Sequence, residues 1–139
     1  IKSFGSWARL ELKEHIESCR VKFVGRISKN KYARLLKTSD IHLYFTRPFI
    51  ASWSLVEAMS SGCFIVSSDV QPTQEIIGID NGNIYVDHTN EDSLINGIRK
   101  AISVPSDVRI ETGSKNRKRA VNHFARHMSL NKWRVLLGN

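Results

Sequence analysis

Short apolar segments alternate along the chain with longer segments in which apolar residues recur three or four positions apart. The short segments are typical of strands, because a strand that is buried on both faces carries few polar residues. The longer segments are typical of amphipathic helices. We predict strands at residues 21–24, 41–45, 63–66 and 84–86.

The predicted helices lie between and around these strands. Gly62 is expected to end one of them, since glycine readily adopts the left-handed conformation that follows a helix. Pro72 suits the first turn of another. The predicted helices cover residues 6–19, a segment beginning at Ser28 or Asn30, a segment from Ser52 or Ser54 to Gly62, residues 72–77, a segment that Thr89 opens, and two tail segments at 107–124 and 129–137. In the segment after Thr89, the side chains expected to pack inward are Leu94, Ile95, Ile98 and Ile102.

Regular alternation of strands and helices predicts an α/β fold with a doubly wound parallel sheet. In such a sheet, ligands bind beyond the carboxyl ends of the strands. We therefore expect the functional residues in the loops that follow Val24, Phe45, Val66 and Val86.

Composition and charge narrow the class of protein. The 139 residues suffice for one domain, and no apolar run approaches the ~18 residues that a membrane-spanning helix needs. The net charge of +8 favours a phosphorylated ligand, a polyanion or an acidic membrane surface as partner. Cys19 and Cys63 belong to no metal or redox spacing and are expected to be buried free thiols. These features predict a cytoplasmic protein.

Residues 46–62 carry the most informative chemistry, because they run from a predicted strand end through a loop into a helix. The free amides at a helix N-terminus bind phosphate oxygens, and Ser52 and Ser54 add hydroxyl donors there. Glu57, one turn further on, can accept two hydrogen bonds from a ribose diol. The commoner interpretation of the Ser54–Glu57 spacing is a capping box that only satisfies its own helix. The spacing leaves both interpretations open.

Four features in order resemble the donor-binding domain of the group 1 glycosyltransferases with the GT-B architecture, in which two Rossmann-like domains face each other. They are Val-Lys-Phe-Val-Gly at 21–25, Leu-Val-Glu-Ala-Met at 55–59 followed by Ser-Ser-Gly, Phe-Ile-Val-Ser at 64–67, and Gln-Glu-Ile-Ile at 74–77 leading to Asn-Gly-Asn-Ile-Tyr-Val at 81–86. This resemblance covers about half of the chain. It implies transfer of a hexosyl group from a nucleotide-sugar to a saccharide or lipid-linked acceptor, with retention of anomeric configuration.

The resemblance also implies roles for individual residues. Glu57 corresponds to the second glutamate of the family's signature, which holds the nucleotide ribose. The first glutamate, which contacts the sugar in most relatives, is replaced here by Phe49. Gly25 and Arg26 occupy the loop beside the base, and Thr46 the small hydroxyl position that opens the signature loop. The remaining candidate donor-site residues are Arg47, Ser52, Trp53 and Ser54.

The family's diphosphate-binding Arg and Lys have no counterpart in this sequence. They would precede Ile1, so we expect residues 1–139 to be a fragment, one nucleotide-sugar-binding domain without the acceptor domain and the first part of the donor domain. No catalytic residue is assigned, and the isolated piece is expected to be inactive. No Asp-x-Asp site is present, and no metal or other cofactor is expected, since positive side chains and a helix dipole replace Mg²⁺ in this architecture.

Several other residues have simpler interpretations. His123 and His127 lack the glutamate of a zinc-hydrolase helix, and His42 is expected to be structural. Asp69 and Glu75 are expected either to face the cleft or to cap and solvate the short helix between them. The basic residues at 115–119 predict a solvated helix face, with peripheral contact at the inner membrane face as the second interpretation and no nucleic acid bound.

Two hypotheses from other classes remain beside the transferase. Phe49 motivates a non-catalytic nucleotide-binding module that has lost sugar chemistry. The net charge motivates a flavodoxin-like regulatory or nucleic-acid-binding domain.

Overall fold

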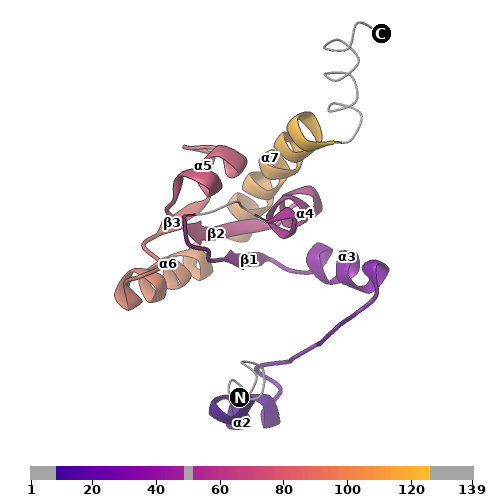
Figure 1. Ribbon diagram of the computed structural model, residues 1–139, viewed down its shortest axis with the longest axis vertical. Coiled ribbons are helices and arrows are strands. Elements are labelled where there is room, and N and C mark those ends of the chain that lie inside the picture. The colour runs from indigo at the N-terminus through magenta and orange to yellow at the C-terminus, as the bar shows by residue number, and fades with distance from the viewer. Residues whose placement is uncertain (1–8, 49–51, 126–139) are drawn as a thin grey trace, which may run out of the picture.

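The computed structural model describes residues 9–48 and 52–125 (Figure 1). From α3 to α6 the chain alternates helices and strands as the sequence predicts. The elements are α2 (Lys13–Glu17), α3 (Lys29–Lys37), β1 (Ile41–Tyr44), α4 (Trp53–Ser61), β2 (Phe64–Ser68), α5 (Gln71–Ile77), β3 (Ile84–Val86), α6 (Glu91–Ser103) and α7 (Ser106–Phe124).

The three strands in the described part of the chain form one parallel sheet in the order β1-β2-β3. Ile41 pairs with Phe64, and Val66 pairs with Ile84. All five residues of β2 are buried, which explains the nearly continuous apolar run that marks this strand in the sequence. The predicted parallel α/β sheet is confirmed.

Helices cover both faces of the sheet, so side chains on opposite sides of β2 enter two separate cores. Ile65 packs on one side against α4, α5 and α7, through Leu55, Val56, Met59, Ile77 and Ala120. Phe64 and Val66 pack on the other side with Ile84 and Val86 of β3 and Ala101 of α6. A third cluster joins α3 to α4 through Leu36, Ala58 and Cys63. Together these clusters confirm the doubly wound arrangement.

Helix α7 packs directly against the end of α4. Gly62 ends α4 in the left-handed conformation, with φ of +84°, as predicted. Gly113 of α7 faces the Gly62 carbonyl so closely that a Cβ at position 113 would overlap this oxygen. The contact therefore depends on a residue without a side chain at position 113.

A network of buried asparagines ties α7 to the sheet. Asn116 is fully buried and donates to the carbonyl of Cys63 at 2.8 Å. The side-chain amides of Asn116 and Asn83 also bond to each other in both directions, at 2.9 and 2.7 Å. Asn83 accepts in turn from the amide of Ile65 at 2.9 Å. Asn116 and Cys63 are buried and Asn83 is half-buried, and the network satisfies polar groups of all three.

The C-terminus of α5 is capped by side chains from other elements. Arg119 of α7 donates to the carbonyls of Glu75 and Ile76, both at 2.8 Å. The hydroxyl of Tyr85 donates to the carbonyl of Gly78 at 2.8 Å. Burial, partly offset by the charge of Arg119, raises the pKa of Tyr85 to about 12, so this hydroxyl remains a donor at neutral pH.

Replacing Arg119 by leucine is expected to lower the free energy of unfolding by about 1.5 kcal/mol, because two helix-end carbonyls lose a charged donor. Urea unfolding measures the change. The exposed Arg117, replaced in the same way, is the matched control and is expected to change stability little. Equal losses in both variants would show that the capping contacts do not stabilise the fold.

Three predictions for the N-terminal part are wrong. Residues 21–24 form no strand, and no described strand pairs with them; the segment runs extended between α2 and α3, apart from the sheet (Figure 1). A strand requires a hydrogen-bonded neighbour, which apolar composition alone does not supply. The helix expected over 6–19 is interrupted within the described part, where α2 has five residues and buries none of them. Cys19 is exposed, with φ of +58° where the helix ends, while Cys63 is buried as predicted.

The predictions for α6 also need correction. Asn90, not Thr89, caps this helix and accepts from the amide of Ser93 at 3.0 Å, while Thr89 donates to Asp87. Ile95 and Ile102 are exposed. Helix α6 faces the sheet through Gly97, where a Cβ would overlap the side chain of Val86. This orientation of the helix turns Ile95 and Ile102 away from the core.

Candidate functional site

The carboxyl ends of the three strands meet at one edge of the sheet, where the connecting loops bond to one another. The amide of Thr46, after β1, donates to the hydroxyl of the buried Ser68 at 2.8 Å. The amide of Asp69, after β2, donates to the carbonyl of Val86 in β3 at 2.8 Å. These bonds place the loop after β1 at the edge where α/β sheets bind ligands.

Helix α4 begins at this edge, and Ser52 is its N-cap. The hydroxyl of Ser52 accepts from the amide of Ser54 at 3.1 Å and lies 2.8 Å from the Ser54 hydroxyl. The amide of Ser52 itself donates to the hydroxyl of Tyr44, at the end of β1, at 2.7 Å. Two serine hydroxyls and the amides of the first turn are thereby brought to one point on the surface.

The capping-box interpretation of Ser54 and Glu57 is wrong, because the cap is two residues earlier. With Ser52 as N-cap, Leu55 takes the position three residues on that a capping glutamate would occupy. The carboxylate of Glu57 is exposed and has no hydrogen bond or ion pair with any residue in the described ranges. It is therefore free to accept hydrogen bonds from a ligand.

Glu57 lies on the side of α4 that faces α3. Burial chiefly, and the nearby negative charge of Glu57 in addition, raise the pKa of Tyr32 in α3. Trp53 lies one turn before Glu57 on the same helix and is 69% exposed. The exposed aromatic ring of Trp53 and the carboxylate of Glu57 thus lie one turn apart on α4.

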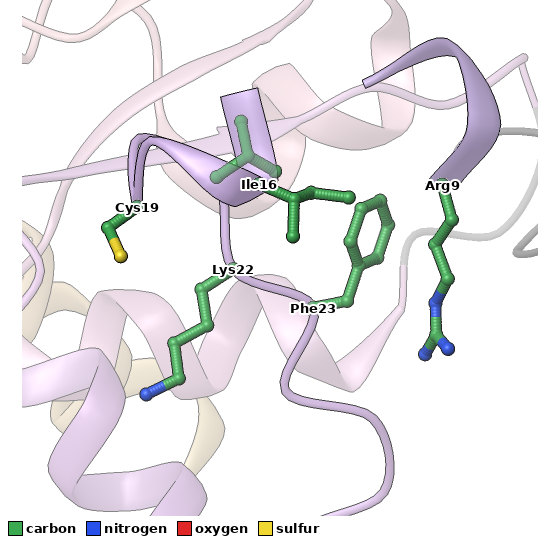
Figure 2. A pocket seen from close by; sticks show the side chains of 6 residues that line it. Arg9, Ile16, Cys19, Lys22 and Phe23 are labelled. Atoms are coloured by element: carbon green, nitrogen blue, oxygen red, sulfur yellow. The ribbon is translucent and has the colours of Figure 1, made fainter. Parts of the chain in front are cut away.

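A hollow of about 240 Å³ adjoins the start of α4, lined by Ser52, Trp53, Val56, Ile76 and Phe124. Small-molecule sites usually enclose about 300–1,000 Å³, so this hollow accommodates part of a nucleotide-sized ligand. A larger hollow of about 650 Å³ lies between α2 and the extended segment after it (Figure 2), but it shares no lining residue with the first and contains none of the predicted site residues.

The structure brings some of the predicted site residues together and leaves others apart. Thr46 is half-buried and Arg47 is exposed, and both lie in the loop that leads to α4. Gly25 and Arg26 lie in the extended segment before α3, and no hydrogen bond or ion pair within residues 9–48 and 52–125 joins them to this corner. Phe49 falls outside the described residues.

Two residues that support the site are not among the sequence predictions. Tyr44 anchors the N-cap, and Ser68 holds the loop after β1. The role of Tyr44 could have been indicated by its position, because it is an aromatic residue with a hydroxyl at the end of a strand, eight residues before the helix cap. Ser68 continues a buried strand with a polar residue, and such residues require a partner.

The other polar candidates have structural roles. Asp69 accepts from Gln74 and Glu75 accepts from Gln71, so both bond to side chains of α5. Neither caps this helix, whose N-cap Val70 has no side-chain cap bond. His42 is half-buried in β1, and burial lowers its pKa. Among the described residues no group of His, Cys, Asp and Glu could hold a metal ion, and His127 lies outside them.

The basic cluster on α7 is divided between two faces of the helix. Asn116 and Arg119 point inward and bond to the sheet and to α5. Lys115 pairs with Glu111 at 2.7 Å on the exposed side, where Arg117 and Lys118 are also exposed.

Within the described ranges no helix has the length and apolar character needed to cross a membrane.

Comparison with known proteins shows which family this chain matches. The family model described as "Glycosyl transferases group 1" matches residues 4–103. Among solved structures, the chain is similar to a sucrose-phosphate synthase from Thermosynechococcus elongatus, with a TM-score of 0.70 and 20% sequence identity. The alignment covers 97% of this chain and 35% of that one, so the chain spans about a third of that protein's length. No curated protein matches the chain.

Proposed function

The chain belongs to the group 1 glycosyltransferases, and from this premise we propose that it forms the nucleotide-sugar-binding part of a hexosyltransferase. The acceptor in this proposal is a saccharide or a lipid-linked saccharide, as in polysaccharide biosynthesis, and the anomeric configuration is retained. One observation carries the proposal: α4 begins at the carboxyl edge of the sheet, its start borders a hollow, and Glu57, one turn further along the helix, has a carboxylate without a partner among the described residues.

The diphosphate is proposed to bind at the start of α4. The amide of Trp53, which has no hydrogen bond within the described residues, and the helix dipole give this end a positive potential. When the sugar leaves, negative charge develops on the departing nucleoside diphosphate, and dipoles fixed in advance stabilise that charge without reorganising. The hydroxyls of Ser52 and Ser54, which lie 2.8 Å apart, can both turn toward the phosphate oxygens. No metal ion is needed in this scheme.

Glu57 is proposed to hold the ribose. A carboxylate accepts hydrogen bonds from both hydroxyls of a vicinal diol, and Glu57 has no partner among the described residues that would compete. The exposed ring of Trp53 offers a flat surface beside it. Thr46, Arg47 and Phe49 also belong to the proposed donor site, and the acceptor is placed on a facing part of the enzyme outside these residues. Gly25 and Arg26 are proposed for the side of the base, but no bond within the described residues joins them to the start of α4.

The proposed location is the cytoplasm, with the basic tail at the inner membrane face. The exposed cations Arg117 and Lys118 in the second half of α7 support such a contact, because a basic group near an anionic surface gains about 1 kcal/mol.

Replacing Glu57 by alanine is expected to weaken nucleoside diphosphate binding roughly 10- to 100-fold, since hydrogen bonds to a charged group contribute about 1.5–3 kcal/mol. Calorimetric titration with UDP, GDP and ADP, and then with their sugars, measures the affinity. Addition of EDTA is expected to leave it unchanged.

The matched control is Glu91→Ala, which removes an exposed glutamate from the first turn of α6. It is expected to bind as the unmodified chain does. Binding that is equal in the Glu57 and Glu91 variants would remove the role assigned to Glu57.

A second candidate function is a nucleotide-binding module without transfer activity. It is favoured by the internal bonds at the start of α4, where the Tyr44 hydroxyl accepts from the amide of the N-cap Ser52 and the Ser52 hydroxyl accepts from the first-turn amide of Ser54. Turnover of any nucleotide-sugar by the whole protein would reject this candidate.

A further inference from the structure

The hollow beside the start of α4 is lined mainly by apolar side chains. Trp53 and Val56 contribute from α4, Ile76 from α5 and Phe124 from the end of α7, and the hydroxyl residue among the lining residues is Ser52. Phosphates and sugar hydroxyls need several polar partners in a site, because they lose bound water when they enter it. A single serine does not supply these partners, so the interior of this hollow suits an apolar group.

Glu57 lies on a different side of α4 from the hollow. Val56 lines the hollow and Glu57 follows it in sequence, so the two side chains leave the helix about 100° apart. Glu57 faces α3, where its charge reaches Tyr32. A nucleotide whose ribose is held by Glu57 therefore leaves the hollow open on the other side of the helix start.

The side of α7 that leads to the hollow is cationic and partly apolar. Arg117, Val121 and Phe124 are spaced four and three positions apart, so they follow one another along one side of the helix. Arg117 is exposed, and Val121 is 47% exposed. The sequence contains no Asp or Glu after Glu111, so no acidic residue of this part of the chain offsets the cations. This charge complements an anionic lipid surface.

Trp53 gives the same corner a second feature of lipid-binding surfaces. Its side chain lines the hollow and is 69% exposed. Tryptophan is enriched where lipid meets water, because its ring is apolar and its N–H is polar. The hollow, the exposed indole and the cations of α7 thus occur together where α4, α5 and α7 pack on one face of the sheet (Figure 1).

We propose that this hollow binds the apolar chain of a lipid-linked acceptor, in which a single long chain is joined to the saccharide through phosphate. The inference rests on the proposed function and deepens it, because it selects the lipid-linked class of acceptor. The hollow borders the start of α4, where the donor diphosphate is proposed to bind. A chain held there brings its saccharide to the donor, whereas a lipid that only anchored the protein would not need to reach this point.

Titration of the whole 139-residue chain with n-alkyl phosphates, from butyl to decyl phosphate, tests this assignment without nucleotide and below the micelle concentrations. Each added methylene group is expected to raise the affinity roughly threefold to fourfold until the hollow is full. Intermolecular NOEs are expected from the alkyl chain to Trp53 and Phe124. An affinity that does not depend on chain length, or NOEs only to the hollow beside α2, would overturn the proposal.

Two isoleucine variants show whether the chain enters this hollow. Ile76→Phe fills part of it, and Ile79→Phe is the matched control, because Ile79 is 69% exposed and is not among the lining residues. Ile76→Phe is expected to weaken decyl phosphate binding about tenfold, whereas Ile79→Phe binds as the unmodified chain does. Equal affinities of the two variants for decyl phosphate would contradict the proposal.

The Val66 amide, within the buried strand β2, reports by hydrogen exchange whether each variant is folded. Should Ile76→Phe not fold, Trp53→Ala takes its place, since it removes an exposed ring. Trp53→Ala is expected to weaken decyl phosphate binding about fivefold. An unchanged affinity in this variant would overturn the proposal.

Two other occupants of the hollow are outcomes of the same measurements. Octyl phosphate is expected to bind about tenfold more tightly than dioctanoyl phosphatidylglycerol, which stands for a two-chain membrane lipid. The reverse order would assign the hollow to membrane lipids and overturn the proposal. NOEs between the lining residues and residues 126–139 in the lipid-free chain would assign the hollow to the chain itself and overturn it as well.

These titrations are distinct from the test of nucleotide binding. Because no nucleotide is present, their failure leaves the role of Glu57 untouched. Failure of the Glu57 test in turn leaves the binding of alkyl chains untouched.

Discussion

Replacing Gly113 by alanine is expected to lower the free energy of unfolding by about 3 kcal/mol, because the new methyl group would overlap the carbonyl of Gly62 and force α4 and α7 apart. Helix propensity predicts the opposite sign, since alanine stabilises a helix by about 1 kcal/mol relative to glycine. Urea unfolding of the two proteins measures the difference. The sign of the change in the free energy of unfolding thus shows whether the close packing at position 113 or the helix propensity of alanine has the larger effect.

The control for this substitution is Ser114→Ala, at the exposed neighbouring position of the same helix. It is expected to be neutral or slightly stabilising. If Gly113→Ala is also stabilising, the close contact between α7 and the end of α4 does not exist in solution.

Replacing Asn116 by leucine is expected to cost about 3 kcal/mol of stability, although leucine has a similar size and is more apolar. The buried carbonyl of Cys63 and the half-buried side chain of Asn83 would both lose their partner. Each buried polar group left without a bond costs about 1–3 kcal/mol. Thermal and urea unfolding both measure the loss.

Asn122→Leu, on the exposed side of α7, is the matched control and is expected to change stability by less than about 0.5 kcal/mol. Equal stabilities for the two leucine variants would show that the asparagine network is not needed to join α7 to the sheet.

The sheet could be predicted from the sequence because its strands are marked by local composition. Residues 64–68 are apolar or small and buried on both faces, and Gly62 and Pro72 mark where the flanking helices end and begin. Residues 21–24 have the same composition but form no strand, because pairing depends on a neighbour that local sequence does not specify. Helix faces were predicted less well where glycine made the contact, as at Gly97.

The candidate site could be predicted only in part, for a related reason. The helix start follows from local spacing, whereas the spacing of Ser54 and Glu57 left open whether Glu57 caps the helix. The cap at Ser52, which leaves the Glu57 carboxylate without a partner among the described residues, is visible only in the structure. Tyr44, Ser68 and Asn116 act through partners that are 8, 22 and 53 residues away along the chain. No periodic pattern marks such pairs, so their roles become visible only in three dimensions.

The most direct test of the nucleotide-binding account is an NMR titration of the 139-residue chain with UDP, GDP and ADP, following every assigned amide. Binding at the start of α4 predicts that the amides of Trp53 and Ser54 shift most, and that Glu57→Ala reduces the affinity without moving the binding position. The capped start of α6, at Ser93, is expected to remain unchanged and serves as the internal reference. Shifts centred on α6 or on the hollow beside α2, with none at Trp53 and Ser54, would contradict the account.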